Sequence, residues 1–165
     1  QALRSLEDAL KSDPLSAGLW ERRAQVRLLW GQDLQAAADD AARALELAPH
    51  LHLARLTRAT IRRVWAGKEE QAGRESVGLL SDAMDDLTEI LKQNPRSTEA
   101  WAEGGRVELD WGRHMQKFGD TGAGREHFTH AVRHFEEALR LNEGLSAGLR
   151  EPLREARRGL LGSTP

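Results

Sequence analysis

The side chains most able to do chemistry are three histidines in the last third of the chain. His127, His130 and His134 are spaced at i, i+3 and i+7, so they share one side of a helix. Histidines on one helical face can ligate a metal such as zinc. That side is opposite Ala131 and Phe135, which we expect to be buried, and the chain has no cysteine. Because no carboxylate is clustered beside the histidines, we predict a solvated face, with no metal site and no cofactor.

A second candidate for chemistry is the tripeptide Asp120-Thr121-Gly122, which matches that of aspartic proteases, where paired carboxylates activate water. That chemistry needs two facing loops, but this tripeptide has no companion and joins two helical segments. The surrounding GDTGAGRE also lacks the Gly-Lys-Ser/Thr end of a phosphate-binding loop. No base, nucleophile and orienting group cluster elsewhere in the sequence, so we expect a protein that is not an enzyme.

Composition restricts the possible partners. The 165 residues are 30% charged and 39% hydrophobic, which suits a globular helical protein, and the net charge of -2 gives no general attraction to nucleic acid. Arginines near the C-terminus are interrupted by Glu151 and Glu155. No apolar run approaches the roughly 20 residues that span a membrane. We therefore expect a cytoplasmic protein that binds neither nucleic acid nor membrane. Because Gln1 stands where a methionine would start a chain, we also expect the sequence to be part of a larger protein.

The elements that would position these side chains follow a repeated helical pattern. Four segments align: ALRSLEDALKSDP, AADDAARALELAP, AMDDLTEILKQNP and AVRHFEEALRLNE. Each has an alanine, an apolar or small residue four positions later, and then Ala-Leu or Ile-Leu, which places these residues on one face of a helix. The alanines are Ala2, Ala37, Ala83 and Ala131. Pro14, Pro49 and Pro95 end the first three segments.

Another helical segment precedes three of these helices. One face of this segment carries Trp20, Ala24 and Leu28 in the first copy and Trp101, Gly105 and Leu109 in the third, and the second copy has Arg55, Ala59 and Arg63 at these positions. Small residues at the middle position allow two helices to cross closely. The sequence therefore predicts an all-α chain of helix pairs.

At these positions the sequence resembles the tetratricopeptide repeat (TPR) family, whose pattern is W-x2-L-G-x2-Y, then A-x3-F, then P. The resemblance implies a right-handed superhelical stack of antiparallel helix pairs over one domain, residues 1–165. Residues 1–14 would be the second helix of a truncated repeat, followed by repeats at 15–49, 50–95 and 96–143 and a capping helix at 144–165. Leu149, Leu153, Ala156 and Leu160 would be the inward face of that cap.

Two departures from the family pattern are visible. Arg23 and Arg58 replace a large apolar residue and Arg27 and Arg62 replace the tyrosine, and we expect these arginines to cover apolar surface while their charged ends stay in water. In the third copy these positions are Gly104 and Glu108. The second and third copies are also long, roughly 46 and 48 residues against about 34 in the family. We expect extended hairpins in which Trp65 packs on Val77 and Leu80, and Trp111, Met115 and Phe118 form an apolar stripe against Phe128 and Val132.

The resemblance implies function as a protein-interaction module. In the family the first helix of each pair lines a concave groove that binds a peptide or a partner's helix. Here the corresponding residues are Glu21, Arg22, Gln25, Leu29, Leu56, Thr57, Thr60, Arg63, Ala102, Glu103, Arg106 and Asp110. Glu21 and Gln25 stand where members that clamp the acidic tails of chaperones have basic or amide side chains, so we expect a different partner that carries both charges and some apolar surface.

The resemblance also suggests a setting for the module. Repeats rich in arginine and alanine occur in bacterial serine/threonine kinases, and we expect a scaffold or signalling protein of that kind. The alternative is a structural role, in which the repeats mediate self-association. The oligomeric state expected from the sequence is a monomer or a weak homodimer.

Overall fold

The computed structural model describes residues 1–162, which contain eight α-helices, one short 3-10 helix and no β-strand. The elements are α1 (Ala2–Ser12), α2 (Ala17–Trp30), α3 (Leu34–Leu47), α4 (His52–Gln71), α5 (Val77–Gln93), α6 (Thr98–Lys117), α7 (Thr121–Leu141), η1 (Glu143–Leu145) and α8 (Ser146–Leu161). The all-α prediction is confirmed for these residues. The last residues of the predicted segment 144–165, numbers 163–165, lie outside the described part of the chain.

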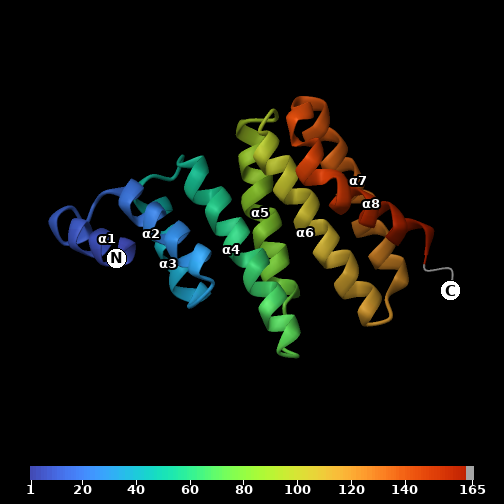
Figure 1. Cartoon of the computed structure of the whole chain (residues 1–165), viewed down its shortest axis with the longest axis horizontal. Coiled ribbons are helices and arrows are strands. Elements are labelled where there is room, and N and C mark those ends of the chain that lie inside the picture. Colours follow the sequence, from blue (N-terminus) through green and yellow to red (C-terminus); the bar gives the residue numbers. More distant parts are fainter. Residues whose placement is uncertain (163–165) are drawn as a thin grey trace.

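The helices lie side by side in chain order along the long axis of the molecule, from α1 at one end to α7 and α8 at the other (Figure 1). The most extensive contacts are within the pairs α2/α3, α4/α5 and α6/α7. Alternate helices also touch, because α2 contacts α4, α4 contacts α6, and α6 contacts α8. This packing of neighbouring helices is consistent with a helical repeat.

Turn and cap residues set where the helices end. Gly31 closes α2 with φ +64°, a left-handed conformation that glycine adopts at little cost. Asp33 begins α3, and its carboxylate accepts a hydrogen bond from the backbone N–H of Ala36 at 3.1 Å. Beyond the first pair the hairpins are longer, since α4 and α6 have 20 residues each and α2 has 14. The prediction of extended second and third hairpins is confirmed.

The crossing of the two helices in each pair is registered by side-chain size. The equivalent positions are Ala24 and Ala41 in the first pair, Ala59 and Leu87 in the second, and Gly105 and Phe135 in the third. Ala24 and Ala41 share one buried cluster, and Ala59 and Leu87 share another. Apart from Gly105, which has no side chain, all of these residues have fully buried side chains. A Cβ atom placed on Gly105 would lie 2.5 Å from Cδ1 of Phe135. Among these crossing positions, the largest second-helix residue, Phe135, therefore meets the smallest first-helix residue, Gly105. Close packing at this crossing requires glycine.

One hydrogen bond recurs at the start of all three pairs. The indole N–H groups of Trp20 and Trp101 each donate to the backbone carbonyl of the proline six residues earlier, at 2.8 and 2.9 Å. In the second pair Arg55 donates from its guanidinium to the equivalent proline carbonyl, also at 2.9 Å. Arg55 thus replaces tryptophan in this contact, which explains how the middle copy keeps the same geometry without an aromatic residue.

The arginines that depart from the family pattern do not hold their charged ends in water, so that expectation is wrong. Arg23 and Arg27 both donate to the carboxylate of Asp40 on α3, at 2.6–2.8 Å, and the Asp40 side chain is only 4% exposed. This hydrogen bonding raises the pKa of Arg23, although burial opposes it. The same arrangement recurs between α4 and α5, where the residues are Arg58, Arg62 and Asp86. Buried carboxylates therefore join the two helices of the first and second pairs.

Three aromatic residues of the hairpins pack differently from the prediction. Trp111 packs on the cluster of α4, α5 and α6 and not on the one that contains Phe128 and Val132, so that part of the prediction is wrong. Phe118, at the end of the expected stripe, is 68% exposed. Trp65 packs on the preceding pair, beside Ala24 and Leu34, and not on Val77 and Leu80. Ala66, its neighbour in sequence, takes the place in the cluster that contains Leu80.

Candidate binding surface

The main candidate site is a hollow of about 350 Å³ formed by α4, α6, η1 and α8. Five of the residues predicted to line a groove lie around it: Leu56, Thr60, Ala102, Glu103 and Arg106. The remaining lining residues are Glu99, Gly144, Leu145, Gly148 and Leu149. The structure therefore brings together predicted residues from the second and third pairs, and adds a wall that the groove prediction did not include.

That added wall comes from the segment after α7. Leu145 packs against the core of the third pair, and Leu149, which is 1% exposed, is part of that core. Leu149 was predicted to face inward as part of a cap, and it does. Its position shows that α8 occupies the place beside α6 that a further first helix would take, so the cap also borders the hollow.

The charged side of the hollow is already organised by contacts between α4 and α6. Arg63 donates from Nε to Glu103 at 2.7 Å and from Nη1 to Asp110 at 3.2 Å. Burial disfavours the charged form of Arg63, but Glu103 and Asp110 outweigh this and raise its pKa. Arg106 also donates to Glu103, at 3.4 Å. Arg63 and Asp110, predicted as free groove residues, are thus engaged in a bridge between helix pairs.

The predicted residues of α2 lie outside the hollow. Glu21 is 4% exposed and accepts a hydrogen bond from the hydroxyl of Thr57 at 2.9 Å, so both residues serve the contact between α2 and α4. Arg22 is exposed, Gln25 is half-buried, and Leu29 is 83% exposed. The single continuous groove expected from the sequence is therefore divided into this α2 surface and the hollow beside α8.

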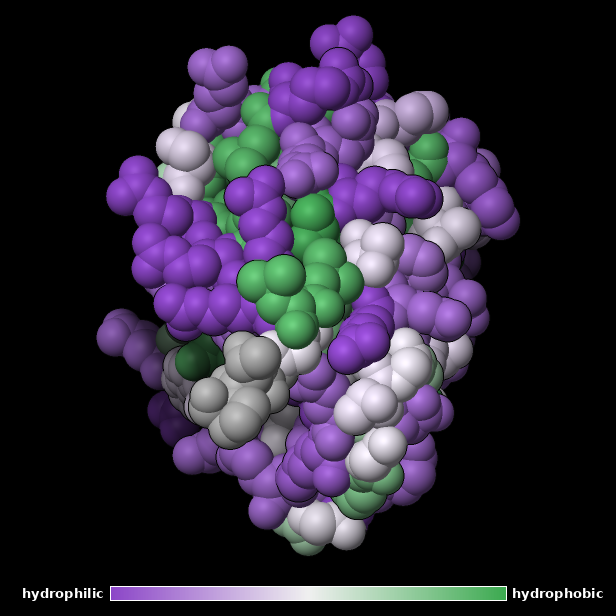
Figure 2. Space-filling view, turned by 90° about the vertical axis from the view of Figure 1, so that its right-hand side faces the viewer, coloured by the Kyte–Doolittle hydropathy of each residue, from purple (hydrophilic) through white to green (hydrophobic). Residues whose placement is uncertain are grey.

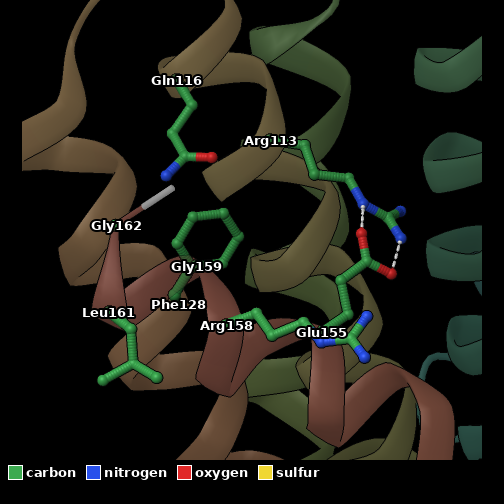
Figure 3. Close-up of a pocket in the computed structure, with 8 residues that line it drawn as sticks. All are labelled: Arg113, Gln116, Phe128, Glu155, Arg158, Gly159, Leu161 and Gly162. Atoms are coloured by element: carbon green, nitrogen blue, oxygen red, sulfur yellow. Dashed lines mark hydrogen bonds and ion pairs between the residues drawn. The ribbon is translucent and has the colours of Figure 1, made fainter. Parts of the chain in front are cut away.

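A second hollow, of about 420 Å³, lies between α6, α7 and α8 (Figure 3). Its floor is the ring of Phe128, which lies against Gly159, where an added Cβ would be 2.4 Å from the ring. On one side the guanidinium of Arg113 faces both carboxylate oxygens of Glu155. This ion pair ties α6 to α8, and Arg158 is the other charged residue that lines the hollow.

The C-terminal end of the row of helices is partly apolar. Figure 2 faces this end and shows hydrophobic residues surrounded by hydrophilic ones. Leu139, Leu153 and Leu161 line a shallow hollow here, and Leu161 is 81% exposed. Two of the nearby arginines are in ion pairs, Arg154 with Glu151 and Arg157 with Glu136.

Of the three α7 histidines predicted to form a solvated face, His130 is exposed, but His127 and His134 pack against α6. His127 Nδ1–H donates to Glu108 of α6 at 2.7 Å, and its ring stacks on Trp111 with 4.4 Å between ring centroids. His134 packs edge-on against Trp101, and burial lowers the pKa of His134. The carboxylate that the sequence reasoning did not find beside these histidines is therefore Glu108, 19 residues before His127.

The protease-like tripeptide has a local structural role. Asp120 is the N-cap of α7, and its carboxylate accepts a hydrogen bond from the backbone N–H of Ala123 at 3.0 Å. Gly119 just before it has φ +87°, which allows the tight turn out of α6. These contacts account for the acidic and small residues of this loop.

The family models and the curated proteins supply no function that could be carried over to this chain. No protein-family model matches the sequence, and a search of curated proteins finds no significant match. Among the described helices, none combines the length and the apolar character needed to cross a lipid bilayer. The geometry of the chain itself is therefore the basis for assigning a function.

Proposed function

We propose that the chain is a TPR-like module: a right-handed superhelix of helix pairs that binds another protein and carries out no catalysis. Three features support a repeat of this kind. Neighbouring helices pack in pairs, small residues register each crossing, and the tryptophan or arginine at the start of each pair bonds to the equivalent proline carbonyl. A cytoplasmic scaffold or signalling protein, such as a bacterial serine/threonine kinase, is the proposed setting.

The binding site we propose is the hollow beside α8, and one observation carries this proposal. Residues of α4 and α6 that the family pattern assigns to a groove converge with Leu145 and Leu149 on one concave, largely apolar surface. Protein sites for ligands typically combine such an apolar surface with a few fixed polar groups. The partner is proposed to be a peptide segment, extended or helical, that inserts one apolar side chain here.

The charges at the rim define the flanking residues of that peptide. Arg106 is about one-third exposed and makes a long 3.4 Å contact to Glu103, so it can turn toward an acidic group on a partner. Glu99 is exposed on the same helix and can meet a basic group. An apolar residue flanked by residues of both charges therefore fits this rim. An acidic chaperone tail does not, because two of the carboxylates, Glu99 and Glu103, would repel it.

Selection from a library of short random peptides tests the proposal. Peptides that bind the immobilised chain would be labelled, and their Kd measured by fluorescence anisotropy on the wild type and two variants. Thr60→Arg places a long charged side chain in the hollow, whereas Thr88→Arg makes the same change on the exposed face of α5. We expect Thr60→Arg to weaken binding by at least about tenfold, equivalent to about 1.4 kcal/mol, and Thr88→Arg to have no effect.

Two results would contradict this assignment. One is a set of selected peptides whose affinity is the same for both variants, which would place binding elsewhere. The other is failure to select any peptide against a chain that circular dichroism shows to be folded and helical.

Self-association is a second candidate, supported by a separate observation. Leu29 and Trp30 at the end of α2 are 83% and 56% exposed, and adjacent exposed apolar residues of this size often mark contact surfaces. Sedimentation velocity over a range of concentrations tests it. A dimer that is lost in Leu29→Ser/Trp30→Ser but kept in Leu15→Ser, a change at another exposed leucine, would favour this role. A wild-type chain that stays monomeric would rule it out.

A further inference from the structure

In the third pair the carboxylate that joins the two helices lies on the first helix, whereas in the other two pairs it lies on the second helix. In the first and second pairs arginines on the first helix bind an aspartate on the second. In the third, Glu108 stands at the position of Arg27, and His134 at the position of Asp40. Gly104 makes room for this exchange, since a Cβ there would lie 2.6 Å from Nδ1 of His134.

The exchange leaves a buried carboxylate whose nearest side-chain partners are imidazoles. The Glu108 side chain is 9% exposed, and in the described part of the chain its ion-pair partners are His127 at 2.7 Å and His130 at 3.6 Å. A buried carboxylate is costly unless it is paired with a cation or coordinates a metal. A divalent cation held between Glu108 and the two imidazoles would offset the charge of the carboxylate directly.

We propose that Glu108, His127 and His130 form a Zn²⁺-binding site between α6 and α7. Two histidine nitrogens and one glutamate oxygen are a ligand set that zinc uses, with water completing the coordination. One ligand atom from each residue already lies within 4.8 Å of the other two. Ligands of a tetrahedral zinc are about 3.3 Å apart, from Zn–N and Zn–O bonds of about 2.0–2.2 Å, so only a small adjustment is needed.

The surroundings let the ring of His130 move and hold His127 and Glu108 in place. His130 is 52% exposed, so its ring can turn toward the ion, and water can fill the open positions. His127 is 19% exposed and is held by the parallel stacking of Trp111, with an interplanar angle of 17°. Glu108 is fixed by burial between the helices. Two ligands are therefore already oriented, and one remains free to close on the metal.

Calorimetric titration of the chelator-treated chain with ZnCl₂ tests the proposal directly. We expect one Zn²⁺ per chain, and a His130→Ala variant that binds at least about tenfold more weakly, since even loss of an outer-shell partner costs about 10- to 100-fold in metal affinity. His130 is the suitable ligand to remove because it is exposed, so the variant should fold. His50→Ala, a change at an exposed histidine outside the cluster, should bind as the wild type does.

A spectroscopic measurement separates this site from a surface histidine that binds metal weakly. Co²⁺ in place of Zn²⁺ should give the visible absorption bands of four-coordinate cobalt, and these bands should be lost in Glu108→Gln. Cu²⁺ should quench the fluorescence of Trp111, which lies against His127, and the quenched component should be absent in Trp111→Phe. Equal Zn²⁺ affinity of the wild type, His130→Ala and His50→Ala would overturn the proposal, as would a wild type that shows no saturable binding.

Discussion

Replacing Gly105 with alanine should destabilise the chain, although alanine is the better helix former. Gly105 lies inside α6 at the point where α7 crosses it, and the ring of Phe135 fills the space that a Cβ would need. The new atom would be 2.5 Å from Cδ1 and Cε1 of that ring, about 1 Å closer than ordinary contact. Phe135 is fully buried in the core of the third pair, so moving its ring would disturb that core.

The size of the effect can be estimated by comparison with another glycine. Gly67 in α4 is exposed, and no atom lies within 4 Å of the position its Cβ would occupy. Gly67→Ala should therefore stabilise the chain by about 1 kcal/mol through helix propensity alone. Gly105→Ala gains the same term but adds overpacking of about 1–3 kcal/mol. The two variants should thus differ by about 1–3 kcal/mol in the free energy of unfolding.

Urea unfolding followed by circular dichroism would measure this difference, and a second change would test its cause. In the second pair Ala59 and Leu87 occupy the equivalent positions and share one buried cluster, so Gly105→Ala combined with Phe135→Leu recreates a combination that the chain already uses. We expect the double variant to be more stable than the sum of the two single changes by about 0.5–3 kcal/mol. Equal stabilisation by Gly67→Ala and Gly105→Ala, or strict additivity in the double variant, would refute the size-matching explanation.

Three further predictions concern the charged and titrating groups. Asp40→Ala should lower the free energy of unfolding by about 3 kcal/mol, because it leaves two partly buried arginines without their carboxylate. Asp39→Ala, at the exposed neighbouring position, should change it by less than about 0.5 kcal/mol in the same urea assay. Arg63→Met should lower the free energy of unfolding by about 2 kcal/mol, because it leaves buried Glu103 poorly paired. Arg22→Met, at an exposed site, should leave the free energy of unfolding unchanged. An equal effect of the two substitutions would show that the bridge between α4 and α6 does not contribute to stability. Burial lowers the pKa of His134, so near pH 6.5 the unfolded chain binds a proton that the folded chain does not. The metal-free wild type should therefore lose more stability between pH 7.5 and 5.5 than the His134→Gln variant does. Identical dependence of stability on pH in the two proteins would contradict this.

The helices and their pairing could be predicted because those features are local in the sequence. Alanine and leucine spacing marks the second helices, Pro14, Pro49 and Pro95 follow their ends, and Gly31 closes α2. Small residues at 24, 59 and 105 marked the crossings correctly. The aromatic contacts at the hairpin tips were less predictable. A small rotation of α4 about its own axis decides whether Trp65 faces the preceding or the following pair.

The charged contacts between helices were missed, although part of the signal was present. Asp-Asp occurs at the same place in two copies, 39–40 and 85–86, each time downstream of two arginines four residues apart. Reading these residues together would have indicated buried ion pairs. A reading that considered the α7 histidines on their own helix alone could not find Glu108, because the contact joins residues whose distance depends on how two long helices align.

The candidate site was predictable in composition but not in shape. Thr60, Ala102 and Arg106 were identified from their places on the first helices, and they do border one hollow. The division of the groove was not predictable, because it depends on Glu21 and Thr57 satisfying each other in the contact between α2 and α4. The contribution of Leu145 also could not be seen, since it depends on where the chain turns after α7.

The central claim, that the hollow beside α8 receives a peptide, is tested most directly by mapping where a selected peptide binds. Amide chemical shifts of the isotopically labelled chain would be recorded during titration with that peptide. The account predicts that the largest changes fall on Thr60, Ala102 and Leu149, with α5 unaffected. Changes confined to Leu29 and Trp30, or to the C-terminal end around Leu161, would contradict it.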